Sequence, residues 1–205
     1  EYSKYIIDEP DLNQKYIYVP LHYQPELTTC PLAEDFVDQL LLVHLISQSI
    51  SPDTLIYVKE HPKQSALGRD DSFYSMLSQI KSVRLISKKF SSYELMNNSV
   101  AVATCTGTAG WEALFRQKPV LMFGNFFYQY ADGVYRIRTI EDCRKACIEI
   151  NKGKMPDLQK IEFFLQAVQN CTIRAVCDPV YWTISTISAE ESNKNMVSAL
   201  MKKLV

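Results

Sequence analysis

The sequence predicts an α/β fold in which helices cover both faces of a parallel β-sheet. Short apolar runs of strand length, such as Leu55–Val58 and Val100–Ala103, do not alternate with polar residues, which is typical of strands buried on both faces. Segments with helical periodicity separate these runs along the chain, as crossover helices separate the strands of a parallel sheet. With 205 residues, of which 47% are hydrophobic, the chain is long enough for one sizeable core.

The strands are expected where β-branched and aromatic residues cluster between turn residues. Pro20 ends the first strand, and Gly124 follows the fifth. In chain order, the expected strands are residues 15–19, 55–58, 83–86, 100–103, 118–123 and a short one at 135–138.

The helices are expected from apolar residues at spacings of three and four. The first helix has such residues at positions 36, 37, 40, 41, 45 and 46, and Ser91 is placed to cap a later one. In chain order, the expected helices are residues 33–49, 72–80, 91–97, 109–116, 140–150 and 158–174, then a last helix with apolar positions 196, 197, 200, 201 and 204.

Composition divides the chain into three parts. Residues 1–14 are polar, contain a Glu-Pro step, and are expected to be a linker or the end of a missing upstream region. Residues 15–150 carry the alternating strands and helices of the main domain. Residues 151–205 are predicted to be a helical extension that packs on the same domain.

The charge balance argues against a nucleic-acid partner, because 22 Lys and Arg residues face 23 Asp and Glu residues. No apolar run is long enough to span a membrane, and no signal-peptide pattern opens the sequence. The irregular spacing of the six cysteines favours reduced thiols over disulfides and indicates a cytoplasmic location. Because no cluster of His, Cys and acidic residues completes a ligand set, no metal is expected.

The stretch Val100–Glu112 has the composition of a phosphate-binding turn. An apolar strand runs into Thr104–Gly110, which supply hydroxyl groups, main-chain N–H groups and no bulk. The helix that follows presents unpaired N–H donors and the positive end of its dipole. Thr106, Gly107 and Thr108 are therefore candidates for phosphate binding. A tight turn in which a threonine only caps the helix is the alternative.

A second polar segment directly follows the strand at residues 55–58. The carboxyl ends of parallel strands meet at one edge of the sheet, where open α/β sheets bind ligands. His61, held by Pro62, can donate a hydrogen bond to a phosphate oxygen, and Lys59 can offset the phosphate charge. Glu60 can bind hydroxyl groups of a sugar or base, or merely pair with Lys59.

Three further side chains are candidates for binding sugar or ribose hydroxyl groups. Glu112, in the first turn of its helix, is placed to accept hydrogen bonds from both ribose hydroxyls, although it could simply complement the helix dipole. Gln24 and Glu26 lie in a long loop and could reach a sugar, or only brace the loop. We therefore expect three loops to converge at one sheet edge, namely residues 21–31, 59–64 and 104–111.

Four segments within a region of about residues 15–138 stand out together, namely Tyr18–Glu26, Lys59–Pro62, Thr106–Ala113 and Lys118–Gly124. In combination they resemble bacterial capsule and surface-polysaccharide biosynthesis proteins. This group is similar to the Kdo transferases and, more distantly, to bacterial sialyltransferases with the two-domain GT-B fold. The resemblance implies a Rossmann-like sheet that corresponds to the C-terminal half of a GT-B glycosyltransferase.

The resemblance also implies a ligand, which is a nucleotide sugar, commonly a CMP-sugar, bound as substrate without a cofactor. His61 and Pro62 would sit at the phosphate and ribose, and Thr106–Thr108 would cradle the phosphate. Trp111 would pack within the fold rather than contact the ligand.

The chain departs from such enzymes because it has room for only one Rossmann-like domain. The acceptor site and the catalytic acid or base are then expected from an N-terminal domain or a partner subunit. Glu26 is the one acidic residue of the early loop that could act near the sugar, so it is the catalytic candidate. The expected partners are a nucleotide sugar and a glycan or lipid-linked acceptor, with at most peripheral association at the inner face of the cell membrane.

Two other functions fit the same residues. A UDP-sugar epimerase of this architecture would use a similar glycine turn and glutamate to hold UDP. A non-catalytic binding module would use the sheet edge for a protein or carbohydrate partner. No motif in the sequence identifies the donor sugar, the acceptor or the stereochemical outcome.

Overall fold

The computed structural model describes residues 2–65 and 68–204. The chain divides into two compact units, Glu1–Ile161 and Glu162–Val205. The first unit contains the whole sheet and every residue that the sequence singles out as a candidate ligand contact.

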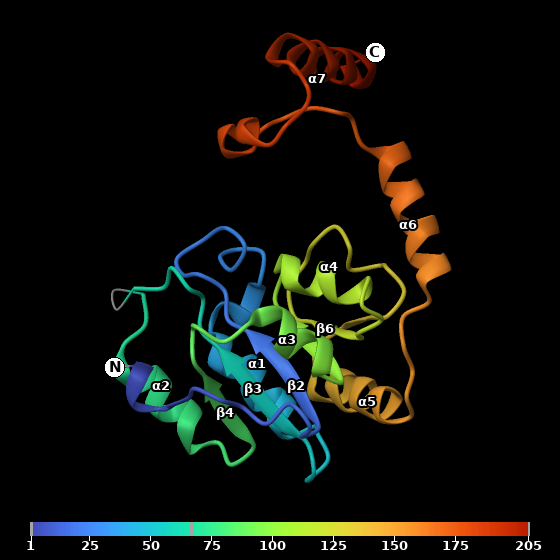
Figure 1. Cartoon of the computed structure of the whole chain (residues 1–205). Coiled ribbons are helices and arrows are strands. Elements are labelled where there is room, and N and C mark those ends of the chain that lie inside the picture. Colours follow the sequence, from blue (N-terminus) through green and yellow to red (C-terminus); the bar gives the residue numbers. More distant parts are fainter. Residues whose placement is uncertain (1, 66–67, 205) are drawn as a thin grey trace. The chain divides into compact units, whose positions relative to one another are not determined.

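One parallel sheet of seven strands forms the centre of the first unit (Figure 1). Its order is β1-β4-β3-β2-β5-β6-β7, and every neighbouring pair runs parallel. This agrees with the predicted fold class. The strands are β1 (Ile6–Ile7), β2 (Tyr16–Pro20), β3 (Leu55–Lys59), β4 (Val83–Ile86), β5 (Ala101–Thr104), β6 (Val120–Met122) and β7 (Val134–Arg136).

The strand order reverses between β2 and β5. From β2 the chain adds β3 and β4 on one side, then returns to add β5, β6 and β7 on the other. At such a switch point, the connections that leave the two central strands diverge and open a crevice at the carboxyl edge. The register brings the strand ends level, because Pro20 pairs with Lys59 and Tyr18 pairs with Val102.

Helices cover both faces of this sheet, as the sequence predicts. Three of them share the main apolar core with the sheet face of Ile17, Ile56 and Leu121. The other two bury their apolar residues elsewhere, and Tyr16 on the opposite face reaches the Leu95 carbonyl oxygen at 2.8 Å. The first group is α1 (Gln39–Ser47), α2 (Asp71–Gln79) and α5 (Ile140–Asn151), and the second is α3 (Ser92–Asn98) and α4 (Thr108–Leu114).

The helix predicted at residues 33–49 is two elements in the structure. A 3₁₀ turn, η2 (Glu34–Val37), is followed by Asp38 in an extended conformation, and α1 starts after it. The Asp38 carboxylate accepts the Leu40 N–H at 3.0 Å, so this residue caps α1 rather than continuing a helix. The apolar periodicity runs across the break because both pieces bury residues in the same core.

Part of the segment predicted as a linker belongs to the sheet. Ile6 and Ile7 pair with Leu85 and Ile86 at the edge, and the Ser87 N–H donates to the Ile7 carbonyl at 3.0 Å. A 3₁₀ turn, η1 (Tyr2–Lys4), precedes this strand. Residue 1 of the predicted linker lies outside the described residues.

The second unit, described by itself, consists of most of α6 (Leu158–Cys171), the turn η3 (Pro179–Thr183) and α7 (Ala189–Leu204). Its contacts include the bond from the Val176 N–H to the Ser192 hydroxyl at 2.9 Å. The unit boundary after Ile161 falls later than the predicted boundary at residue 150, and packing of residues 151–205 on the main domain stays a prediction. The side chain of residue 204, one of the predicted apolar positions, lies outside the described part.

Within residues 2–65 and 68–204, no helix is long and apolar enough to cross a bilayer.

Candidate functional site

A pocket of about 320 Å³ opens at the switch point of the sheet. The ends of β2 and β3 form one side of it, and residues of α3 and α4 form the other. The lining residues are Tyr18, Pro20, Leu21, Lys59, Glu60, His61, Pro62, Ser92, Tyr93, Met96, Thr108, Ala109 and Glu112. Residues of all three predicted loops therefore line one hollow, with Leu21 contributed by the early loop.

The early loop, residues 21–31, is joined to the other two loops by hydrogen bonds. The Gln24 N–H donates to the Gln64 side-chain oxygen at 2.8 Å, which links the early loop to the segment after β3. The Thr106 N–H donates to Nε2 of His22 at 3.1 Å, which links the early loop to the turn after β5. The predicted convergence of the three loops at one sheet edge is thus confirmed.

Lys59 lines the pocket, but its ammonium group is already engaged. Its Nζ donates to the Phe90 carbonyl and to the Ser92 hydroxyl, each at 2.7 Å. Burial lowers the pKa of this amine. Because an ammonium carries three N–H groups, one donor is left for a ligand. The first role of Lys59 in this structure is to join β3 to the start of α3.

His61 is half-buried in the pocket wall and is held in one tautomer. Its Nδ1 accepts the Lys63 N–H at 3.3 Å. Burial lowers the pKa of the imidazole, so the neutral ring is favoured at pH 7. A neutral ring that accepts at Nδ1 carries its proton on Nε2. His61 can therefore offer an Nε2–H donor to a ligand, and the exposed Pro62 follows it directly.

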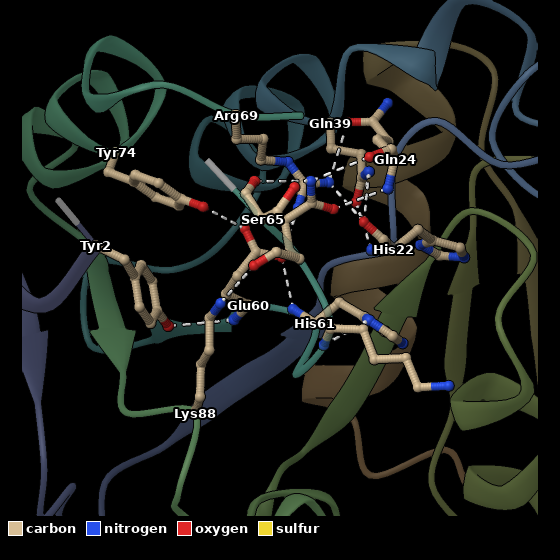
Figure 2. Close-up of polar contacts among 12 residues, drawn as sticks. Tyr2, His22, Gln24, Gln39, Glu60, His61, Ser65, Arg69, Tyr74 and Lys88 are labelled. Carbon is tan, nitrogen blue, oxygen red and sulfur yellow. Dashed lines mark hydrogen bonds and ion pairs between the residues drawn. The ribbon is translucent and has the colours of Figure 1, made fainter. Parts of the chain in front are cut away.

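Glu60 is buried in an ion pair beneath the pocket (Figure 2). One carboxylate oxygen accepts Nη1 of Arg69 and the His61 N–H, each at 2.5 Å. The other oxygen accepts the Tyr74 hydroxyl at 2.7 Å. Glu60 was predicted to bind a sugar, but protein donors occupy both of its carboxylate oxygens. Glu60 is therefore part of the frame of the site.

The turn after β5 is shaped by side chains packed against glycine. The Thr106 hydroxyl donates to the Thr28 carbonyl at 2.6 Å, and the Gly107 N–H donates to the Thr104 hydroxyl at 3.1 Å. Gly107 has an ordinary φ of −69°, so its lack of a side chain serves packing and not backbone strain. A Cβ at this position would lie 2.9 Å from Oγ1 of Thr104 and 3.1 Å from Nε2 of His22.

Thr108 and Glu112 lie on the first turns of α4, and both line the pocket. Thr108 is exposed, and Glu112 is partly exposed. Their side chains are the polar groups of this helix that a ligand can reach. Trp111 packs between Phe115 and Phe127, with ring centroids 4.8 and 5.3 Å away, in keeping with the packing role expected from the sequence.

The two candidates of the early loop do not line the pocket. The Gln24 side chain donates to the Val37 carbonyl at 2.5 Å and accepts Nη2 of Arg69 at 3.0 Å. Glu26 is exposed and accepts the Thr28 hydroxyl at 2.7 Å. The structure therefore assigns Gln24 a bracing role and leaves the Glu26 carboxylate at the surface of its loop.

His22 and Arg69 are central to the site but were not singled out in the sequence. His22 lies two residues after β2, and the Gln39 side chain accepts its N–H at 2.8 Å. Arg69 precedes α2 and is buried, with Nη2 donating to the His22 carbonyl at 2.6 Å. The position of His22 at the end of a buried strand was an available signal. The role of Arg69 depends on contacts across 9 and 47 residues that no local pattern reveals.

His22 is neutral in the folded protein. Burial, assisted by the nearby Arg69 charge, lowers its pKa from 6.5 to about 4. The neutral ring accepts the Thr106 N–H at Nε2, and the Thr104 hydroxyl lies 3.3 Å from the same atom. A protonated ring would lose the hydrogen bond from the Thr106 N–H and place a charge beside Arg69.

All six cysteines are free thiols. Over residues 2–65 and 68–204, no group of three or more His, Cys, Asp or Glu side chains is placed to hold a metal ion.

Comparison with known proteins identifies a family for most of the chain. Residues 30–178, which are well over half of the 205 residues, match the family model described as capsule polysaccharide biosynthesis protein. Among curated proteins, none matches the sequence.

Solved structures share the architecture at low sequence identity. The UDP-GlcNAc 2-epimerase from Methanocaldococcus jannaschii has a TM-score of 0.53 at 15% identity, with coverage of 82% of this chain and 48% of the epimerase. The beta Kdo 2,7 transferase KpsC from Thermosulfurimonas dismutans has a TM-score of 0.48 at 19% identity, with coverage of 78% and 55%. The chain thus spans about half the length of these proteins. The likeness to the epimerase concerns the fold.

The low pKa of His22 predicts a stability that falls in mild acid. The unfolded chain binds this proton near pH 6.5, and the folded protein resists it until about pH 4. The contribution of His22 is therefore complete above pH 6.5 and is lost as the pH falls toward 4, by on the order of 3 kcal/mol. The free energy of urea unfolding should show this acid loss in the wild type and a flatter profile in His22→Gln.

His44 on α1 provides the matched control, because its side chain is exposed. The profile of His44→Gln should run parallel to that of the wild type. A His22→Gln profile that also runs parallel from pH 7 to pH 4 would show that this ring does not resist protonation.

Proposed function

The chain belongs to the capsule polysaccharide biosynthesis protein family, and we propose that it is the nucleotide-sugar-binding part of a glycosyltransferase in capsule or surface polysaccharide synthesis. The observation that carries this proposal is the pocket at the switch point of the sheet. It combines His61, a donor suited to phosphate, with Glu112, an acceptor suited to ribose. The proposed donor is a CMP-sugar, bound as substrate.

Phosphate binding falls mainly on His61 and the start of α4. The Nε2–H of the neutral His61 can donate to a phosphate oxygen, and Lys59 retains one N–H in the same pocket. The main-chain N–H groups of Thr108 and Ala109 begin a helix, so they lack acceptors within it. Because α4 has only seven residues, its dipole adds little, and directed donors matter more.

Ribose binding falls on Glu112. A carboxylate can accept two hydrogen bonds from vicinal hydroxyl groups. The pocket lining contains the carboxylates of Glu60 and Glu112, and Glu60 is already paired with Arg69, so Glu112 is the one assigned to the ribose. Tyr93 and Met96 on α3 add apolar surface on which a base can pack. Gln24 and Glu60 are left out of the proposed sugar contacts, because protein groups already engage their side chains.

In the proposed reaction, negative charge grows on the nucleotide phosphate as its bond to the donor sugar breaks. Donors that are fixed in place beforehand stabilise that charge and lower the barrier. The acceptor, a glycan or a lipid-linked glycan, and the catalytic base are proposed to come with a further domain or subunit. Glu26 is the acidic candidate within this chain, because its carboxylate is exposed near the site. The free thiols fit a cytoplasmic place of action, at most peripheral to the membrane.

Titration of the 205-residue protein with CMP, UMP, GMP and a CMP-sugar tests the proposal directly. Amide shifts in NMR should move for Thr108, Ala109 and Glu112, and CMP should bind most tightly of the three nucleotides. A preference for UMP would favour an epimerase-like donor site. Absence of binding by all four would overturn the proposal and favour a binding module for other partners.

His61→Ala should weaken CMP binding by about 1.5–3 kcal/mol, which is the range of a hydrogen bond to a charged group. The melting temperature should change little, because the ring is at the pocket surface. Isothermal calorimetry gives the affinity, and exposed His44→Ala is the control. If the melting temperature collapses while CMP still binds, His61 is structural and the phosphate lies elsewhere.

Glu112→Gln should weaken CMP binding by about 1.5–3 kcal/mol through loss of charged acceptors for the ribose hydroxyls. The same substitution should matter less for 2′-deoxy-CMP, which lacks one of those hydroxyl groups. A thermodynamic cycle that combines the wild type and Glu112→Gln with CMP and 2′-deoxy-CMP isolates this contact. Equal losses for both nucleotides would place Glu112 away from the 2′-hydroxyl.

A further inference from the structure

Arg69 lies behind the pocket and does not line it, yet its guanidinium group joins two of the loops that build it (Figure 2). We propose that Arg69 is a positioning residue that holds His61 and the turn at Thr106 in the geometry that binds phosphate. This inference rests on the nucleotide site proposed above and adds to it a residue that does not line the pocket.

The first arm of this arrangement fixes His61. Nη1 of Arg69 donates to Oε1 of Glu60 at 2.5 Å, with the side chains 2% and 0% exposed. The same oxygen accepts the His61 N–H at 2.5 Å. Glu60 is held from its other oxygen by Tyr74, and its own N–H donates to the Tyr2 hydroxyl at 3.1 Å. The backbone of His61 is therefore bound to a carboxylate that cannot move freely.

The second arm fixes the turn after β5. Nη2 of Arg69 donates to the His22 carbonyl at 2.6 Å and to the Gln24 side chain at 3.0 Å. His22 in turn accepts the Thr106 N–H at Nε2, 3.1 Å away. One guanidinium group thus connects the wall that carries His61 to the turn that leads into α4.

The chemistry of this connection requires arginine. The planar guanidinium presents several N–H groups in a fixed fork, so it can serve three acceptors on two loops, whereas a lysine ammonium acts as a point charge. Cζ of the guanidinium group lies over the Phe73 ring, 5.1 Å from its centroid. Replacing a buried ion pair by apolar residues is often neutral for stability, so positioning is a better account of this pair than stabilisation.

This role predicts that changing Arg69 lowers the affinity only for ligands that carry a phosphate group. The proposed phosphate contacts come from His61 and the start of α4, which follows the turn that Arg69 helps to hold, whereas the ribose and base contacts come from Glu112 and α3. Disturbing Arg69 should therefore weaken CMP binding and leave the binding of cytidine, which has no phosphate, nearly unchanged. A general loss of folded protein would weaken both ligands alike.

Two variants test this in the 205-residue protein. Arg69→Lys keeps the charge but removes the fork. The double variant Glu60→Gln/Arg69→Met removes both charges, so no buried charge is left unpaired if the single change prevents folding. The control is Lys15→Met/Asp53→Asn, which removes an ion pair of 3.3 Å next to the amino ends of β2 and β3. NMR titrations with CMP and cytidine give both dissociation constants.

We expect each Arg69 variant to bind CMP about tenfold or more weakly and the control to match the wild type. Cytidine should bind all four proteins equally. Equal losses of affinity for the two ligands, or no loss for either, would overturn the positioning role.

If the wild type binds neither ligand, the proposed function fails, and NMR spectra recorded without ligand test the positioning role separately. The His61 imidazole nitrogens and the Thr106 amide should then shift in the Arg69 variants, and unchanged signals would refute the connection.

Discussion

The pairing of β2 with β5 is the constraint on which the rest of this structure depends. Ile17 and Tyr18 lie beside Ala101 and Val102 at the centre of the sheet, with later strands added outward on both sides. The connections that leave these two strands must therefore diverge. Leu21 after β2 and Thr108 after β5 line the crevice over the sheet, where buried polar groups need partners from loops distant in sequence.

The polar groups at this edge separate into a frame and a set available to a ligand. Glu60, Arg69, Gln24 and His22 are bonded to one another or to the main chain, as Figure 2 shows for most of these contacts. Nε2–H of His61 and the side chains of Thr108 and Glu112 remain at the pocket. The frame groups are therefore engaged by protein partners, and the pocket groups are the ones that a ligand can contact.

The strands were predictable because their apolar runs have a simple physical cause, namely burial on both faces. The two-residue β1 was not, because it is too short to show any periodicity and is held by its pairing with β4. Residue positions at the site were predictable from the strand ends, but side-chain directions were not. Lys59 and Glu60 are the two residues before His61 in sequence, yet their side chains point toward Phe90 and Arg69. Such choices depend on partners that fold into place from other segments.

The ion pair below the pocket also bears on the electrostatics of the phosphate site. An isolated carboxylate next to His61 would repel an incoming phosphate and would raise the pKa of the imidazole by favouring its charged form. Arg69, at 2.5 Å from Glu60, offsets that negative charge, and burial then keeps His61 neutral. A neutral imidazole fixed at Nδ1 needs no reorganisation to donate from Nε2. The frame thus prepares both the geometry and the charge of the donor before a nucleotide arrives.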